Sequence, residues 1–599
     1  MHPFLAKILV RPIVLTSSLL LAVTAMASPV QLRTEHRPNP LGIDASTPHF
    51  AWQSDALTPN WMQTAYQLLV ASNEENLATA KADVWDSGRI TSSDSINIAY
   101  AGPALKPQTR YFWLVRVWDN GGGNSTSAPA WFETGLLSPS NWRAKWIRRA
   151  DPAAESELAA VRWLWLPSAD AQKVAAGTRA DFRYVLHVNA PPMRASLHIV
   201  SSGAYVATVN GVTTGRHTAW GAFDWEEIGN LLKPGDNEIV VNVIAQAKVR
   251  APIVSTALAA SLRITAQDGT ERRIPSDNTW LARSDNDARW QPAQVVGPIT
   301  TPLSIGTDRH SEVSGPNRIA SDAALLRKDF TVAASIQSAR LTITALGAYQ
   351  AFLNGKPVAA RNILDPGFTD FHKRVLYQTY DVTSLLTDGD NTIAAILGSG
   401  WHGSPMTWAG TREYPEPDAL RAQLDITLAD GSHKTIVTDE TWQSAPAPTL
   451  FSEIYAGEVY DARLEDRGWN APHFAATNWA NAIVEKISPE VQLTAQPDLS
   501  IAVSNTLHPI SITPGNEAHL VIYDIGQNMV GNILLHVHGP RGTLIRMRFA
   551  ERLNPDGSIY TENLRNATVT DTYILAGNGD ETYTPAFTFH GFRDRKSVV

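Results

Sequence analysis

The chain has 599 residues, which at roughly 150 residues per domain corresponds to about four domains. Fifty Lys and Arg stand against 58 Asp and Glu, so the chain lacks the excess of positive charge with which proteins bind nucleic acid. The absence of cysteine excludes disulfides, thiolate zinc sites and thiol catalysis. We therefore expect a multidomain protein with no nucleic-acid partner.

The first residues have the pattern of an export signal. Lys7 and Arg11 precede an apolar run, and Ala25-Met26-Ala27 provides the small residues of a cleavage site. About 14 apolar residues span only about 21 Å as a helix, which is shorter than the roughly 30 Å core of a bilayer. We predict a signal peptide at 1–27, a mature chain from Ser28 that is secreted or periplasmic, and no membrane span.

From residue 28 onward, short alternating apolar runs such as 65–70 and 195–200 are separated by Gly, Pro, Asn and Asp. This pattern is typical of antiparallel β-sandwiches. Helical periodicity is nearly absent, except at 74–80, where Ser72 or Asn73 is placed to cap a short helix. The sequence therefore predicts an all-β protein of tandem β-sandwich domains.

Four sequence blocks occur twice in the same order, which indicates an internal repeat. The repeated pairs are 203–211 with 347–355, 231–237 with 385–391, 264–269 with 426–431, and 277–280 with 439–442. The Asn-Gly step that ends the first block, after alternating apolar residues, is typical of a tight hairpin. We therefore predict two consecutive sandwiches of one type, at 141–315 and 316–485.

The Asp-Gly-Asp-Asn tetrad at 388–391 is acidic enough to resemble a calcium loop. Its counterpart in the first repeat, Pro234-Gly235-Asp236-Asn237, keeps only part of that acidity. Turn formation therefore explains the tetrad better than metal binding, and a structural calcium ion stays open. The histidines lack ligand spacing, and we interpret His590, beside Phe589 and Phe592, as a packed and hydrogen-bonded residue.

The segments LDPGFTDFHKRVLYQTYDVT at 364–383 and LGSGWHG at 397–403 resemble the N-terminal sandwich domain of bacterial α-L-rhamnosidases. Segments similar to that family's leading fibronectin-like domain lie at 40–44, 48–52, 85–88 and 105–113. Segments similar to the concanavalin-like sandwich before its catalytic domain lie at 523–531, 549–553 and 587–593. The resemblance implies a fibronectin-type-III-like sandwich at 28–140, jelly-roll sandwiches at 141–315 and 316–485, and a truncated concanavalin-like sandwich at 486–599.

The resemblance implies an α-L-rhamnosidase that hydrolyses terminal α-L-rhamnose from glycosides or polysaccharides with inversion and without an organic cofactor. Inversion needs two carboxyl groups about 6.5–9.5 Å apart, and in the family both belong to a helical barrel that follows the last sandwich. The sequence up to Val599 shows neither the helical pattern of that barrel nor its Arg-Asp-Glu segment. We therefore expect a noncatalytic N-terminal part that contains no catalytic residue and is inactive alone.

The last six residues, 594–599, place three charges where the family continues with an apolar strand. A domain that ended inside its own strand would leave backbone groups unpaired. We hypothesise that these six residues are foreign to the gene.

Binding of rhamnose-containing carbohydrate is the activity that such a fragment could keep, because aromatic side chains can pack on sugar rings beside polar groups that bind hydroxyls. The candidate carbohydrate-binding residues are Trp401, His402, Trp408, Asp365 and Asp370. Core packing competes as an explanation for the Trp residues, and turn formation for the Asp residues. The alternative function is that of a noncatalytic carbohydrate-binding or adhesion protein built of β-sandwiches.

Overall fold

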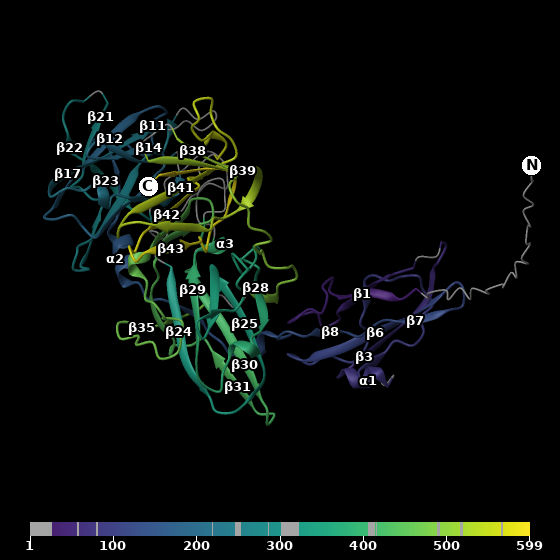
Figure 1. Cartoon of the computed structure of the whole chain (residues 1–599). Coiled ribbons are helices and arrows are strands. Elements are labelled where there is room, and N and C mark those ends of the chain that lie inside the picture. The colour runs from purple at the N-terminus through teal and green to yellow at the C-terminus, as the bar shows by residue number, and fades with distance from the viewer. Residues whose placement is uncertain are drawn as a thin grey trace, which may run out of the picture. The chain divides into compact units, whose positions relative to one another are not determined.

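The computed structural model describes residues 27–56, 59–79, 82–217, 220–245, 253–285, 287–300, 323–404, 414, 416–487, 491–515, 519–564 and 567–598. The chain divides into two compact units, Met1–Leu137 and Ser138–Val599 (Figure 1). Antiparallel strands dominate both units, which confirms the all-β prediction. No helix within the described ranges has the length and hydropathy of a membrane span. The predicted signal peptide lies outside the described residues, except for its last residue, Ala27.

The first unit is a sandwich of two sheets around an aromatic core. One sheet has the order β1 (Pro29–Thr34), β2 (His49–Ser54), β5 (Ile98–Ala99), and the other the order β4 (Trp85–Asp86), β3 (Gln63–Ala71), β6 (Arg110–Asp119), β7 (Asn124–Thr126), with β8 (Ala130–Glu133) paired to β6. Phe50 and Trp113 pack between the sheets with ring centroids 4.6 Å apart. The predicted short helix is confirmed as α1 (Glu74–Ala78), whose cap is the side chain of Asn73.

The second unit contains the two repeats, each with one sheet of matching strand order. In the first repeat this sheet runs β16 (Trp220–Glu227), β13 (Arg194–Ser201), β19 (Leu258–Thr265), β10 (Arg162–Trp165), β23 (Gln294–Pro298), with β20 (Glu271–Pro275) paired to β19. In the second repeat it runs β28 (Arg374–Asp381), β25 (Ile336–Leu346), β30 (Ala419–Leu428), β9 (Trp146–Arg148), β36 (Ile483–Glu485), with β31 (His433–Val437) paired to β30 and β37 (Gln492–Ala495) to β28.

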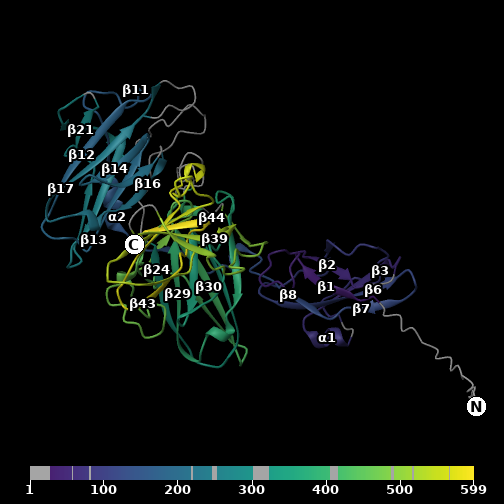
Figure 2. The ribbon, with the colours of Figure 1, turned by 45° about the horizontal axis from the view of Figure 1, so that its top comes forward.

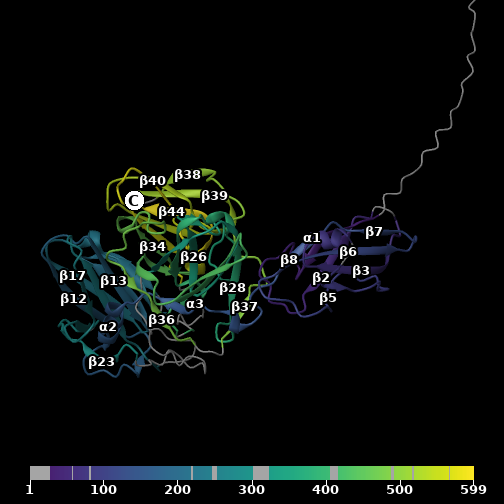
Figure 3. The same cartoon turned by 90° about the horizontal axis from the view of Figure 1, so that it is seen from below.

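The facing sheets of the two repeats match strand for strand as well. The first repeat has β15 (Val212–His217), β14 (Ala204–Val209), β17 (Gly235–Ile244), β12 (Arg179–Val188), β21 (Leu281–Ser284), β22 (Gln291–Pro292), and also the small pair β11 (Val174–Ala175) and β18 (Ile253–Val254). The second has β27 (Lys356–Pro357), β26 (Ala348–Leu353), β29 (Gly389–Gly398), β24 (Ala324–Val332), β32 (Gln443–Pro446), β35 (Ala480–Asn481). Figure 3 shows β12 beside β17, two strands that pair over ten positions.

The two repeats are nested rather than consecutive. Strand β9 pairs with β30 and β36 of the second repeat, although sequence analysis placed its residues in the first. The first repeat, which opens with helix α2 (Pro152–Ala160), therefore lies in the chain between β9 and β24 of the second. A strand of three residues carries too little pattern to be assigned across a whole intervening domain.

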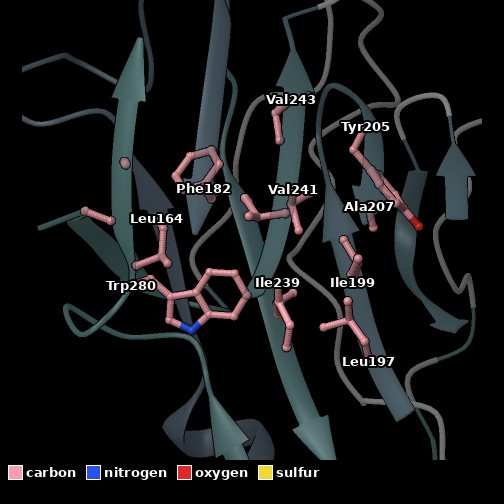
Figure 4. Close-up of a cluster of buried hydrophobic side chains, with 14 of the residues drawn as sticks. Leu164, Phe182, Leu197, Ile199, Tyr205, Ala207, Ile239, Val241, Val243 and Trp280 are labelled. Carbon is pink, nitrogen blue, oxygen red and sulfur yellow. The ribbon is translucent and has the colours of Figure 1, made fainter. Parts of the chain in front are cut away.

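Alternation along the strands builds the core of each repeat. Figure 4 shows Ile239, Val241 and Val243 of β17 on one face of the strand, toward the cluster that holds Trp280. Side chains on a strand alternate between its two faces, so the intervening residues lie outside this core. Trp442 is buried at the equivalent position of the second repeat.

Two of the repeated sequence blocks contact each other. The Asn354 side chain donates a hydrogen bond of 2.7 Å to Asn391, and Asn210 donates one of 2.8 Å to Asn237 in the first repeat. Asn354 and Asn210 have φ values of 52° and 50°, a left-handed conformation that Asn tolerates better than most residues. The predicted Asn-Gly hairpin turn and the second block are thus held together, which explains why both recur.

The last sandwich has a seven-stranded sheet and a short two-stranded one. The large sheet runs β33 (Thr449–Glu453), β34 (Gly457–Asp461), β42 (Thr570–Ile574), β41 (Leu544–Ala550), β44 (His590–Val598), β39 (Leu520–Gly531), β38 (Ser511–Pro514), and the small one pairs β40 (Leu535–His538) with β43 (Asp580–Tyr583). Figure 2 shows β44 beside β39, and its backbone pairs with β39 and β41 as far as Val598. Strands β33 and β34 join this sheet, whereas sequence analysis assigned them to the second repeat.

The interpretation of His590 is confirmed. Its side chain is buried in the last sandwich, stacks on Phe549 with ring centroids 4.3 Å apart, and has its Nε2 3.1 Å from Asp571.

Candidate functional site

Trp401 lies in the short helix α3 (Gly400–Gly403), directly after β29. Its half-buried ring packs against Phe368 and Phe589, each with a centroid distance of 5.9 Å. Phe589 belongs to the last sandwich, so the indole connects that sandwich to the second repeat. Among the described residues, the buried Nε1 of Trp401 has no hydrogen-bond partner. Trp408 lies outside the described residues.

His402 is buried between aromatic rings and carboxylates. Its ring stacks on Tyr414 with a centroid distance of 5.4 Å and an interplanar angle of 13°. Its Nδ1 is 3.6 Å from a carboxylate oxygen of Asp418, and its Nε2 is 4.0 Å from one of Glu416. The His402 side chain is only 1% exposed, so these neighbours cover almost all of its surface.

The two candidate aspartates lie in different environments. Asp365 is buried and accepts hydrogen bonds from Asn362 at 2.8 Å and from the Tyr380 hydroxyl at 2.9 Å. Burial raises the pKa of Asp365, and those hydrogen bonds oppose the shift. Asp370 is exposed, and its hydrogen bond with Lys373 lowers its pKa.

A cavity of about 110 Å³ adjoins Asp365 and the hydroxyl-bearing rings of Tyr349 and Tyr380. Trp401, His402 and Asp370 do not line it. The structure therefore does not gather the candidate residues in this cavity, and their role in carbohydrate binding stays a prediction.

A larger cavity, of about 540 Å³, was missed by sequence analysis. Strands β15 and β16 of the first repeat form one wall, and β41 and β42 of the last sandwich contribute to the other. A usable sequence signal was present: Asp224-Trp225-Glu226-Glu227 stands in the first repeat where the second has Gln378-Thr379-Tyr380-Asp381. An aromatic residue among acids appears in only one of the two copies.

No cluster of three or more potential metal ligands occurs among the described residues. In the tetrad at 388–391, the Asn391 side chain donates to the carbonyl oxygens of Thr387 and Gly389 at 2.7 and 2.9 Å. Its Oδ1 accepts from the Thr387 amide at 2.9 Å. These hydrogen bonds form a turn, in the manner expected of Asn in loops.

Three sequence families match the chain, each over a different domain. "Rha78A-like, N-terminal immunoglobulin domain" matches residues 29–138, where sequence analysis expected a fibronectin-like sandwich. "Alpha-L-rhamnosidase N-terminal domain" matches 334–505, and "Bacterial alpha-L-rhamnosidase concanavalin-like domain" matches 516–594.

The curated relatives of the chain are also called α-L-rhamnosidases. An α-L-rhamnosidase of Streptomyces avermitilis is 38% identical over 580 residues, which cover 93% of this chain and 54% of the relative. An α-L-rhamnosidase of Alteromonas sp. is 27% identical over 558 residues, which cover 93% of this chain and 43% of that relative. The chain thus spans about half the length of the relatives that it matches.

Solved structures agree with the sequence matches. The S. avermitilis α-L-rhamnosidase complexed with L-rhamnose superposes with a TM-score of 0.77 and 36% identity, over 96% of this chain and 56% of that one. The α-L-rhamnosidase from Dictyoglumus thermophilum superposes with a TM-score of 0.64 and 28% identity, over 95% of this chain and 46% of that one. The chain therefore contains the N-terminal β-sandwich region of bacterial α-L-rhamnosidases.

Proposed function

We propose that the protein is an exported α-L-rhamnosidase that releases terminal α-L-rhamnose with inversion, and that residues 28–599 are its noncatalytic framework. The alignment with the S. avermitilis α-L-rhamnosidase carries the proposal, because it runs through 93% of this chain and only 54% of the relative. The reaction would then be performed by residues outside the sandwiches.

The hydrogen bonds of Asp365 and Asp224, two of the carboxylates beside the cavities, support this division of labour. An inverting hydrolase needs one carboxylic acid free to protonate the leaving oxygen and one carboxylate free to activate water. Asp365 instead accepts hydrogen bonds from Asn362 and Tyr380, and Asp224 accepts one of 2.6 Å from Tyr205. These groups hold neighbouring side chains in place.

The proposal is tested by expressing the complete reading frame from its source DNA. The hydrolysis of 4-nitrophenyl α-L-rhamnopyranoside by the product is then followed by proton NMR. We expect hydrolysis in which β-L-rhamnose forms first, because water attacks the face opposite the leaving group. Initial formation of α-L-rhamnose would contradict inversion. Absence of hydrolysis would contradict the enzyme and favour the noncatalytic carbohydrate-binding or adhesion protein.

Export is supported by the position of Ser28. Its backbone nitrogen donates a hydrogen bond of 2.5 Å to Asp55 Oδ1. Cleavage after Ala27 would turn this nitrogen into a terminal ammonium group beside a carboxylate, which is a favourable pair. N-terminal sequencing of the protein from culture medium or periplasm should begin at Ser28, and an intact N-terminus at Met1 would contradict export by this signal.

A further inference from the structure

The sequence contains four Asn-Gly steps, which lie in different surroundings. They begin at Asn120, Asn210, Asn354 and Asn578. An Asn that precedes Gly is prone to deamidation, because glycine has no side chain to hinder attack of its backbone nitrogen on the Asn side-chain amide. The reaction requires that this amide turn toward the nitrogen, so the fold decides which of the four steps can react.

Two of these steps form the hairpin turns of the repeats, where the Asn side chain is bound at both ends. Asn210 donates hydrogen bonds of 2.8 Å to Asn237 and of 3.0 Å to the carbonyl oxygen of Leu231. Its Oδ1 accepts one of 3.0 Å from the Glu238 amide. Asn354 makes the equivalent three hydrogen bonds in the second repeat. Neither side chain can turn toward the following glycine without breaking these hydrogen bonds.

The third step, at Asn120, is held in place although Asn120 is exposed. Its Oδ1 accepts a hydrogen bond of 3.1 Å from the Met62 amide, and its Nδ2 donates one of 2.9 Å to the carbonyl oxygen of Asn60. The nitrogen that would attack is bound as well, because the Gly121 amide donates a hydrogen bond of 2.9 Å to Asp119. Exposure alone therefore does not make an Asn-Gly step reactive.

The fourth step, Asn578-Gly579, lies in the loop between β42 and β43 of the last sandwich, and Asn578 is exposed. Among the residues that the structure describes, neither the Asn578 side-chain amide nor the Gly579 backbone nitrogen has a hydrogen-bond partner. Gly579 has a φ of 100°, and the space in which a side chain would stand there is open. The side chain of Asn578 can therefore turn toward the Gly579 nitrogen without breaking a contact.

We propose that Asn578 is a site of spontaneous deamidation in the folded protein, whereas the fold protects the other three Asn-Gly steps. The Gly579 nitrogen loses its proton to a base and forms a bond to Cγ of Asn578. The bond from Cγ to Nδ2 breaks, and ammonia leaves with a proton from water. Water then opens the resulting five-membered succinimide at either carbonyl, which gives aspartate or isoaspartate. Water is the only co-reactant, and no group is oxidised or reduced.

The modification adds a carboxylate to a loop that is already acidic. Glu581 holds this loop by accepting hydrogen bonds of 2.9 and 2.7 Å from the amides of Ala576 and Gly577. It also accepts one of 2.8 Å from the Tyr573 hydroxyl, and the adjacent Asp580 is exposed. Each conversion therefore adds one negative charge beside two others, so the modified protein can be separated from the unmodified protein by anion exchange.

The test is incubation of the purified protein at pH 8, followed by peptide mass spectrometry. We expect the peptide that contains Asn578 to gain about 1 Da, as a mixture of aspartate and isoaspartate. It should convert at least about ten times faster than the peptides with Asn120, Asn210 and Asn354, which must first lose their hydrogen bonds. In guanidinium chloride the four peptides should convert at similar rates, because the fold no longer distinguishes them.

Asn578→Gln is the matched variant, because its longer side chain keeps the amide but would have to close a less favourable six-membered ring. The acidic species should therefore be absent from its anion-exchange profile. Three results would overturn the inference: no conversion of Asn578 in the folded protein while the unfolded chain reacts, conversion of folded Asn210 as fast as that of Asn578, or formation of aspartate without isoaspartate. None of these results depends on whether the protein hydrolyses rhamnosides.

Discussion

Tyr349 donates a hydrogen bond of 2.7 Å to Gln378, and both side chains are buried in the second repeat. At the equivalent positions of the first repeat, Tyr205 donates one of 2.6 Å to Asp224. Gln378 passes the network on to Gln496, whereas Asp224 borders the large cavity. Equivalent tyrosine contacts thus lie in a buried network in the second repeat and beside a cavity in the first.

Removing the hydroxyl of Tyr349 should destabilise the second repeat. Tyr349→Phe leaves Gln378 without its donor in a buried position, so we expect the free energy of unfolding to fall by about 1–3 kcal/mol. Urea unfolding followed by tryptophan fluorescence measures it. Tyr455→Phe, at a residue 39% exposed, is the control and should change stability by less than about 0.5 kcal/mol. Equal effects would contradict the assigned role.

Trp401 should contribute to stability through its contacts with Phe368 and Phe589. Trp401→Ala is expected to lower the free energy of unfolding by about 3 kcal/mol, the lower end for loss of a large aromatic ring, because the indole is only half-buried. The carbohydrate-binding role predicted for Trp401 requires weaker binding of methyl α-L-rhamnopyranoside by Trp401→Phe. Unchanged affinity would assign the residue to packing alone.

Stability should fall as the pH rises through neutrality, because of Glu458. Burial, with the charge of Asp571, raises the pKa of this fully buried carboxyl from 4.5 to about 7. The folded protein therefore holds the proton more tightly than the unfolded chain. The resulting stabilisation is complete below pH 4.5 and is lost by pH 7, a difference of about 3 kcal/mol.

Urea unfolding at pH 5 and pH 8 measures this difference. Glu458→Gln should show a flatter dependence on pH than the unmodified protein, since it removes one of the titrating groups. Glu453, whose pKa is also raised to about 7 by burial, still contributes to the pH dependence of stability in that variant. If the free energy of unfolding of Glu458→Gln changed with pH as much as that of the unmodified protein, the role assigned to Glu458 would be contradicted.

Substituting the equivalent residues Asn391 and Asn237 should lower the stability of the two repeats by similar amounts. Asn391→Ala and Asn237→Ala each remove several hydrogen bonds to the turn, so each should cost about 1–3 kcal/mol of folding free energy. Because these side chains bind backbone groups, EDTA should leave the melting temperature unchanged. A decrease with EDTA that calcium reverses would show instead that a calcium ion stabilises the protein.

The sandwich architecture could be predicted because burial on one face of a strand forces a period of two, and because the repeated blocks keep their order. The nesting could not, since the three-residue strand β9 pairs with Leu420, which lies far along the chain from Ile147. Local pattern does not encode such a distant partner. The same holds for β33 and β34, which lie within the sequence of the second repeat but pair in the last sheet.

The candidate site was predictable to a smaller extent. Trp401 was selected from its Gly-rich loop, but its packing partner Phe589 belongs to another domain, so its burial was hidden from sequence analysis. The large cavity requires Trp225 from the first repeat and Arg546 from the last sandwich. The strand register shows that Trp225 and Thr379 are equivalent, and hence that the two repeats differ at this position.

The central claim is that the sandwiches support a reaction performed elsewhere. Its most direct test is the release of rhamnose from 4-nitrophenyl α-L-rhamnopyranoside by purified 28–599 protein. We predict no release above the buffer blank, under conditions in which the product of the complete reading frame is active. Release by the 28–599 protein that disappears when a single one of its carboxylates is substituted would contradict the account.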